Sequence, residues 1–379
     1  MIGFKIQFIN LRNDLPTTIL KILVISRYTN LVRHRSEAEI FIGLAKSGID
    51  ITIMTVSDSP FNNLFSIAGI KVISHHPEKR FSVRSILKIR KELRKSQYQV
   101  VHLFNSKAIP AGIIASLGLN VKIVVYRGAK GPYWHDISAY IGHFHPRVSA
   151  VICLSEYVKE SILKQKVIDP KKLHVITKGI DPSWFEGVTP FFYEFQKLNS
   201  KAKIITCVAH LRPVKGVDYL IEAAGILANH KDLHFVFVGK GTNQETFRKK
   251  LSLMPNFNRL HGFGEVDDVR PHILACNIYV QPSISEGLAK SVIEAMVYSK
   301  PIIITKSGGP EEIIQNDVSG KVVPIRNAKA LAKSILELLN NDIDQKRFGR
   351  AAKKNLLKNL TIEATIAKTL KVYQTILSV

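Results

Sequence analysis

The segment KIITCVAHLRPVKGVDYLIEAAGILANHKDLHFVFVG (203–239) contains one strand–helix–strand unit. Both of its ends are short runs rich in β-branched and aromatic residues, which is typical of strands buried on both faces of a parallel sheet. The apolar residues between these runs suit a helix, and a loop with Arg212, Lys215 and Gly216 leads into it. The segment therefore predicts a β–α–β unit with a cationic loop after its first strand.

The same alternation of strands and helices extends over most of the chain. Short β-branched runs recur at residues 21–26, 51–56, 100–104, 122–126, 150–155 and 174–177, and again at 203–209, 234–239, 259–263, 278–283, 301–305 and 321–324. Segments of helical character lie between most of them. The pattern predicts an α/β fold of two tandem, Rossmann-like, doubly wound parallel-sheet domains whose strand ends face a shared cleft.

The limits of the two domains follow from the irregular stretch between the two series of strands. Residues 179–201 hold two prolines, two glycines and an aromatic cluster, without a strand period, and we place the interdomain connection there. We expect the first domain to span residues 1–185 and the second to span residues 200–360. Residues 1–20 are interpreted as a loosely attached extension, and the helical segment 361–379 is expected to pack back on the first domain.

Composition indicates a folded globular protein. Of the 379 residues, 46% are hydrophobic and 22% are charged. No apolar run approaches the length of a membrane-spanning helix, and the N-terminal residues lack the pattern of a signal peptide. The three cysteines, Cys153, Cys207 and Cys276, are widely spaced within or beside apolar runs, so we expect buried thiols in a reducing, cytoplasmic compartment.

The net charge of +24 favours an anionic partner such as a membrane surface, a nucleic acid or a polyphosphate. The segment RFSVRSILKIRKELRKSQY (80–98) concentrates this charge: Ile86, Ile89 and Leu93 trace one helical face, and cations crowd the rest. This segment is interpreted either as a solvated outer helix or as a helix that rests on anionic lipid headgroups at the inner face of the cytoplasmic membrane. Because aromatic residues are not interleaved with the cations, no nucleic-acid partner is expected.

Two loops of the second domain predict a phosphate site. Arg212 and Lys215 precede a helix, where a guanidinium fork and an ammonium group suit a diphosphate. Gly239 and Gly241, after the next strand, allow a ligand to approach the backbone closely. The G-x-G pattern is weak by itself, because it lacks the third glycine of a dinucleotide-binding motif.

The segment SISEGLAKSVIEAM (283–296) adds two carboxylates beside the start of a helix near Leu288. The free N–H groups of a helix start attract anions, whereas a carboxylate repels phosphate and accepts hydrogen bonds from hydroxyl groups. A ligand with a diphosphate between two polyhydroxylated ends would satisfy both Glu286 and Glu294. Alternatively, Glu294 is paired with a basic neighbour and Glu286 only begins the helix.

These motifs resemble those of a known family. Glu286 and Glu294, with seven residues between them, and the run SKPIIITKSGGPEEIIQNDVSGKVVP (299–324) are similar to the group 1 or family 4 retaining glycosyltransferases, which have the GT-B fold. Lys215 with Gly216 matches too, as do SEYVKESIL after the strand AVICLS and the passage HVITKGID (174–181). The resemblance covers residues 21–360 and is strongest over 203–324.

The resemblance implies a role for each matching residue. Arg212 and Lys215 would hold the donor diphosphate, Glu294 the nucleotide ribose and Glu286 the donor sugar. The turn Gly287, Leu288 and Ala289 would support sugar or phosphate through backbone N–H groups, and the backbone near Phe263 would border the base. Enzymes of this fold need no bound metal or permanent cofactor, because protein cations neutralise the leaving diphosphate.

The chain departs from the family pattern in the first domain. The loop SRYTNLVRHRSEAEI (26–40) lacks paired glycines, although His34 and Arg35 stand near there, and Arg127 follows a strand where the family often has a histidine. Arg127 would steady the leaving phosphate or an acidic acceptor, or only pair with a carboxylate. His102 is interpreted as a residue at a strand end in the cleft and His135 as an acceptor contact, without a firm role for either.

The sequence thus predicts a metal-independent glycosyltransferase of the hexosyltransferase type. It would move a sugar from a nucleotide sugar to a lipid-linked or anionic glycan acceptor, such as a lipopolysaccharide or capsule precursor. The alternatives are a sugar epimerase or phosphorylase of the same fold and a basic binding protein without enzymatic activity.

Overall fold

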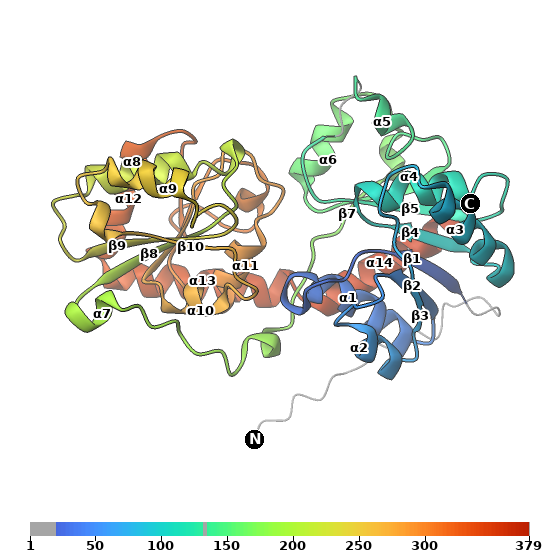
Figure 1. The fold of residues 1–379 in the computed structure, drawn as a ribbon, viewed down its shortest axis with the longest axis horizontal. Helices are drawn as coiled ribbons and strands as arrows, with labels where there is room; N and C mark the ends of the chain where they lie inside the picture. Colours follow the sequence, from blue (N-terminus) through green and yellow to red (C-terminus); the bar gives the residue numbers. More distant parts are fainter. Residues whose placement is uncertain (1–19, 132–134, 379) are drawn as a thin grey trace.

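The computed structural model describes residues 20–131 and 135–378, which form two α/β domains (Figure 1). The expectation of a loosely attached extension at residues 1–20 falls, apart from Leu20, outside the described residues. All three cysteines are buried and free, as expected.

The first domain is built on a sheet of seven parallel strands in the order β3-β2-β1-β4-β5-β6-β7. The strands are β1 (Lys21–Ile25), β2 (Asp50–Thr55), β3 (Lys71–Ser74), β4 (Val100–Leu103), β5 (Lys122–Arg127), β6 (Val148–Cys153) and β7 (Leu173–Val175). The helices are α1 (Leu31–Lys46), α2 (Asn62–Ile67), α3 (Val83–Ser96), α4 (Asn105–Ala115), α5 (Ile137–Tyr140) and α6 (Glu156–Leu163). The reversal of strand order between β1 and β4 makes this a doubly wound sheet.

The second domain repeats this plan with six parallel strands in the order β10-β9-β8-β11-β12-β13. The strands are β8 (Lys203–Val208), β9 (Leu233–Val238), β10 (Leu260–Gly264), β11 (Ile278–Gln281), β12 (Ile302–Thr305) and β13 (Lys321–Val323). The helices are α7 (Phe195–Leu198), α8 (Val217–Ile226), α9 (Glu245–Ser252), α10 (Arg270–Ala275), α11 (Lys290–Val297), α12 (Ala328–Leu339) and α13 (Asp342–Asn359). Here the strand order reverses between β8 and β11.

Strand β3 is an addition to the predicted strands. Its four residues lie at the edge of the first sheet and are exposed or half-buried, and Lys71 and Ser74 at its two ends are polar. An edge strand buries too little surface to require a continuous apolar run, so the pattern of buried strands does not reveal it.

The last helix, α14 (Ile362–Leu377), follows α13 but packs against α1 of the first domain, where Figure 1 shows it in red. Tyr373 is fully buried there, and its hydroxyl lies 2.6 Å from Nδ1 of His102. His102 is only 2% exposed, so the expectation that it faces the cleft is wrong. Burial, together with the charge of Lys178, lowers the pKa of His102 to about 3.

The chain crosses between the domains twice, and the two crossings are bonded to each other. The N–H of Ile180 donates to the carbonyl of Leu360 at 3.0 Å, and the N–H of Ile362 donates to the carbonyl of Ile180 at 3.2 Å. The N–H of Gly179 donates to the hydroxyl of Thr365 at 2.9 Å. These bonds join the outgoing and the returning segment side by side.

A membrane-spanning helix would need a long apolar segment. Across the described ranges, no helix combines the length and the hydropathy that crossing a bilayer requires.

Candidate active site

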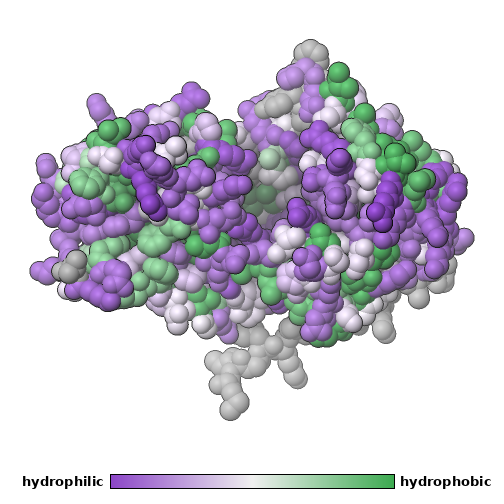
Figure 2. Space-filling view, viewed as in Figure 1, coloured by the Kyte–Doolittle hydropathy of each residue, from purple (hydrophilic) through white to green (hydrophobic). Residues whose placement is uncertain are grey.

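A cavity of about 310 Å³ lies between the two domains, and we call it the interdomain cavity. It opens where the loops after β8 and β11 meet, which is the switch point of the second sheet and the usual place for a ligand in this type of fold. Figure 2 shows the molecule hollowed between its two lobes. The predicted site residues that line this cavity are Arg212, Lys215, Gly239, Glu286, Leu288, Ala289 and Glu294.

Glu286 and Lys215 form an ion pair in the interdomain cavity, although they are 71 positions apart in the chain. Both side chains are largely buried, and the hydroxyl of Ser283 donates to the same carboxylate at 3.3 Å. The backbone of Glu286 is fixed by bonds to Ser307 and Gly309 at 2.9 and 3.0 Å. The carboxylate and the ammonium group are therefore held at one point of the cavity wall.

Glu294 lies on α11 and is only 3% exposed. Burial raises its pKa above the usual range, although the ammonium group of Lys290 at 3.3 Å acts in the opposite direction. Lys290 also donates a 2.6 Å hydrogen bond to the carbonyl of Val32 in the first domain. The basic neighbour that the sequence left open as an alternative is therefore present, and it also bridges the two domains.

Arg212 lies at the start of the short 3-10 helix Pro213–Lys215 and is exposed to the cavity. Within the described parts of the chain, no ion pair of Arg212 is found, so its guanidinium can receive an anion. Gly239 borders the same space with a φ of 144°, and a Cβ there would lie 2.2 Å from the carbonyl of Ala209. A glycine is needed at this position because the ends of β8 and β9 approach closely.

Helix α11 begins at Lys290, two residues later than predicted. Ala289 has a φ of 45°, which interrupts the helix before it, and both Ala289 and Leu288 line the cavity. Gly287 lies beside this turn against the first domain, where a Cβ would lie 2.2 Å from the carbonyl of Gly128. The turn therefore sits between the cavity and the other domain.

Three residues singled out from the sequence, Arg127, Phe263 and His135, lie outside the cavity lining. The guanidinium of Arg127 donates to the carbonyls of Ala129, Lys130 and Gly131 at 2.7–2.9 Å, so it is held by its own loop. Phe263 lies outside the lining and packs in an aromatic cluster with Phe191, Tyr193 and His272. Beyond it in the chain, Glu265 and Val266 reach the cavity instead. His135 is exposed and lies outside the cavity lining.

Arg33 and Lys290 are cavity residues that sequence reasoning did not find. Arg33 of α1 pairs with Glu265 of the second domain at 2.6 Å and lines the cavity beside it. Both cations contact the opposite domain, so only the relative placement of the domains reveals them. Among the described residues, no group of three or more His, Cys, Asp or Glu side chains is arranged to hold a metal ion.

Comparison with known proteins identifies the family. Residues 190–355 match the model of the glycosyl transferases group 1, and residues 38–184 match that of glycosyltransferase family 4. The chain belongs to the group 1 glycosyltransferases with the GT-B fold, as its motifs predicted.

Several proteins similar to this chain are named as glycosyltransferases. The chain is 24% identical, over 69% of its length and 71% of the other protein, to the Escherichia coli UDP-Gal:alpha-D-GlcNAc-diphosphoundecaprenol alpha-1,3-galactosyltransferase. It is 23% identical to the Staphylococcus aureus poly(ribitol-phosphate) alpha-N-acetylglucosaminyltransferase, over 60% of this chain and 44% of that protein. An uncharacterized glycosyltransferase of Methanocaldococcus jannaschii is 30% identical, over 59% of each chain.

Solved structures share the fold over nearly the whole chain. A glycosyltransferase from Rickettsia africae superposes with a TM-score of 0.77 at 22% identity, covering 95% of this chain and 99% of the other. Anabaena Alr3699/HepE in complex with UDP-glucose superposes with a TM-score of 0.75 at 17% identity, covering 95% and 100%. The predicted arrangement of two doubly wound domains is thereby confirmed.

Proposed function

We propose that the protein is a retaining glycosyltransferase that takes a hexosyl group from a nucleotide sugar bound in the interdomain cavity. The observation that carries this proposal is the lining itself, because Arg212, Lys215, Glu286 and Glu294 meet in one cavity at the switch point of the second sheet. The UDP-glucose complex of Alr3699/HepE supports a nucleotide-sugar donor. A permanent cofactor has no part in the proposal.

The charges of the cavity suit the departure of a diphosphate. As the bond between sugar and diphosphate breaks, negative charge grows on the diphosphate. Arg212, Lys215 and the free N–H groups at the start of α11 would receive this charge without a metal ion. Lys215 is paired with Glu286, so a bound donor would share the ammonium group between the carboxylate and a phosphate oxygen.

The two carboxylates would hold the carbohydrate ends of the donor. Glu294 lies within α11 beside the turn and would accept hydrogen bonds from the ribose, while Glu286 would accept from the sugar. Closure of the first domain over the cavity would exclude water, so that the acceptor rather than water attacks the sugar. In a retaining reaction the acceptor attacks from the face that the diphosphate leaves.

The acceptor in this proposal carries phosphate and is linked to a lipid or a cell-surface polymer precursor, as in lipopolysaccharide or capsule synthesis. The names of the Escherichia coli and Staphylococcus aureus relatives both include a phosphorylated acceptor, which supports this class. Helix α3 would bring the protein to such an acceptor at the inner face of the cytoplasmic membrane. Its buried face packs inward through Ile89 and Leu93, and Val83 and Leu87 are exposed beside its cations.

Glu286→Gln tests the enzymatic proposal. We expect turnover with the preferred nucleotide sugar to fall about 100-fold or more while the fold is kept, because the neutral amide holds neither the sugar hydroxyls nor Lys215 as a carboxylate does. Glu245→Gln is the matched control, since Glu245 pairs with Lys249 on the exposed surface of α9. Turnover is measured with a panel of nucleotide sugars, and product analysis separates transfer from epimerisation and phosphorolysis. Unchanged turnover would contradict a role of Glu286 in the reaction.

Charge reversal on α3 tests the membrane contact. The triple change of Lys88, Lys91 and Arg94 to Glu should weaken binding to vesicles that contain phosphatidylglycerol by about 100-fold, since each surface cation contributes about 1 kcal/mol. The same triple change at Lys346, Arg350 and Lys354 on α13 alters the net charge equally and serves as the control. Equal losses in both variants would show a non-specific effect of net charge and argue against docking through α3.

A further inference from the structure

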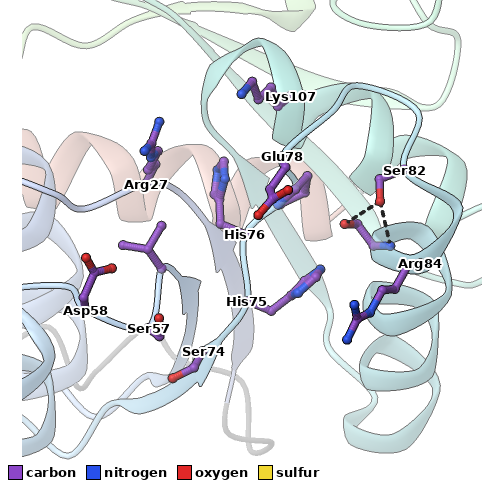
Figure 3. A pocket seen from close by; sticks show the side chains of 13 residues that line it. Arg27, Ser57, Asp58, Ser74, His75, His76, Glu78, Ser82, Arg84 and Lys107 are labelled. Carbon is purple, nitrogen blue, oxygen red and sulfur yellow. Dashed lines mark hydrogen bonds between the residues drawn. The ribbon is translucent and has the colours of Figure 1, made fainter.

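The first domain holds a second cavity, of about 670 Å³, which we call the first-domain cavity (Figure 3). It lies at the carboxyl ends of β1, β2 and β3, from which Arg27, Ser57 and Ser74 reach it. The opposite wall comes from the starts of α3 and α4, with Ser82, Arg84 and Lys107. In an open parallel sheet, the carboxyl ends of the strands are where ligands bind.

The side chains that line the first-domain cavity carry more positive than negative charge, which suits binding of an anion. Arg27, Arg84 and Lys107 are exposed, and in the described part of the chain none of the three forms an ion pair. Two carboxylates, Asp58 and Glu78, also line the cavity, so the cations outnumber them. The starts of α3 and α4 add partial positive charge through the helix dipole, and Ser82 and Asn105 cap some of their first N–H groups.

Two histidines sit among these cations. Burial, with the charges of Arg27 and Lys107, lowers the pKa of His76 to about 4, and its Nε2 lies 3.1 Å from the side-chain amide nitrogen of Asn105. Burial, with the charges of Lys88 and Arg84, lowers the pKa of His75 as well. Burial is the main cause in both cases, and the nearby cations act in the same direction; these cations would attract an anion into the cavity. Serine hydroxyls from β2, β3 and α3 supply donors to the oxygens of such an anion.

The first-domain cavity adjoins an exposed apolar surface and is joined to the interdomain cavity by a short loop. The loop after β1 connects the two cavities, since Arg27 lines one and Arg33 lines the other, and six residues span at most about 20 Å. On the other side, Phe81, Val83 and Leu87 are exposed at the start of α3, beside Ser82 and Arg84 of the cavity wall. An amphiphilic molecule would find a polar site and an apolar surface next to each other.

We propose that the first-domain cavity binds the phosphate or diphosphate group of the acceptor through Arg27, Arg84 and Lys107. This inference rests on the proposed function in taking the ligand to be the acceptor, and it adds the acceptor's chemistry and the residues that hold it. The sugar of the acceptor extends along the loop after β1 toward the donor in the interdomain cavity. A lipid chain on the phosphate lies against the apolar start of α3.

Binding of inorganic pyrophosphate tests this site without any donor reaction. The result can therefore be interpreted even if the protein shows no transferase activity. The interdomain cavity is first saturated with UDP, and the imidazole of His76 is followed by NMR. We expect pyrophosphate to raise the pKa of His76, because a bound anion favours the protonated ring. The double variant Arg27→Ala/Lys107→Ala should bind pyrophosphate about 100-fold more weakly, since it loses two charge-assisted contacts.

Three further arms sharpen the test. Lys46→Ala, an exposed cation at the end of α1, is the control and should leave pyrophosphate binding unchanged. Arg27→Lys keeps a cation at this position and serves as a second variant in case the double variant folds poorly. It should bind pyrophosphate more tightly than the double variant does. Geranyl diphosphate identifies the source of the phosphate: tighter binding than pyrophosphate indicates a lipid-linked acceptor, and equal binding indicates a water-soluble phosphorylated one. No response of His76 in the native protein, or equal affinity in the double variant, overturns the proposal.

Discussion

Glu294, which we propose to hold the ribose of the donor, shows at the scale of one residue how such a role can reduce stability at neutral pH. Its carboxylate is buried, and its pKa is raised above the usual range. The folded state therefore holds the proton more tightly than the unfolded state does, so this group stabilises the fold at low pH. That stabilisation is fully present below pH of about 4.3 and is lost as the pH rises through the raised pKa.

Substitution of Glu294 by Gln should separate binding from stability. Because the amide does not ionise, the free energy of unfolding of the variant relative to the native protein should increase as the pH rises from about 4 to about 7. The affinity for UDP should fall about 10-fold through loss of the proposed ribose contact. Urea unfolding at several pH values and a UDP titration measure the two effects, with the exposed Glu222→Gln on α8 as control. A variant that is less stable than native at neutral pH and binds UDP normally would show a structural role alone.

At this scale the sequence is informative about the second domain and less so about the first. Arg212, Lys215, Glu286 and Glu294 follow strands of one parallel sheet, and the carboxyl ends of such strands meet at one edge, so their proximity could be predicted. The roles of these residues stay a prediction. The position of Arg127 could not be foreseen, because its partners are backbone carbonyls of its own loop, which a sequence pattern does not display.

At the scale of elements, the turn before α11 lies directly against the first domain. A Cβ at Gly287 would lie 2.2 Å from the carbonyl of Gly128 and 3.5 Å from Val158, both in the first domain. No atom of the second domain stands among these nearest neighbours. The absence of a side chain at Gly287 is therefore required by the contact between domains rather than by the fold of the second domain.

Gly287→Ala should therefore hinder closure without unfolding the second domain. We expect UDP binding to change little and turnover to fall about 100-fold, because the acceptor site is displaced by an ångström or more from the donor. Turnover and the radius of gyration from small-angle X-ray scattering, each with donor present, are the measurements. Gly225→Ala is the matched control, since its Cβ would meet the flexible side chain of Met254 at 3.3 Å and Cδ of Pro255 at 4.0 Å, both within the second domain. Native turnover together with a native radius of gyration in Gly287→Ala would refute this interpretation.

The elements also show where a sequence pattern stops being sufficient. The buried strands of both sheets are continuous apolar runs and could be predicted, whereas β3 at the sheet edge could not. The inward residues Ile89 and Leu93 of α3 follow from helical spacing, but the exposure of Val83 and Leu87 does not, because it depends on which neighbours cover the helix. The edges and uncovered faces of elements thus require the three-dimensional structure.

At the scale of the whole molecule, the last helix, α14, completes the hydrophobic core of the first domain. Ile362, Leu370 and Tyr373 of α14 are buried in the same apolar cluster as residues of β1 and α1. The first domain is thus assembled from residues that are more than 300 positions apart in the sequence.

Tyr373→Ala should therefore weaken the first domain, although the residue follows the second domain in sequence. Truncation of a buried aromatic side chain should reduce the free energy of unfolding by about 3 kcal/mol or more, and His102 also loses its hydroxyl partner. Hydrogen exchange should report the loss of protection in β1 and β4 while β8 and β9 stay protected. Thr375→Ala on the exposed face of α14 should change little. Loss of protection confined to the second domain would be inconsistent with this assembly.

The paired crossings at Ile180 and Leu360 have a mechanical consequence. A single connecting segment lets two domains rotate independently, whereas two segments that are hydrogen-bonded side by side resist twisting and leave one easy direction of bending. The two domains should therefore move about a single hinge axis at the paired crossings, so that each closure brings the same two faces together. Only a small part of the free energy of substrate binding is then needed to bring the two domains into the orientation required for the reaction.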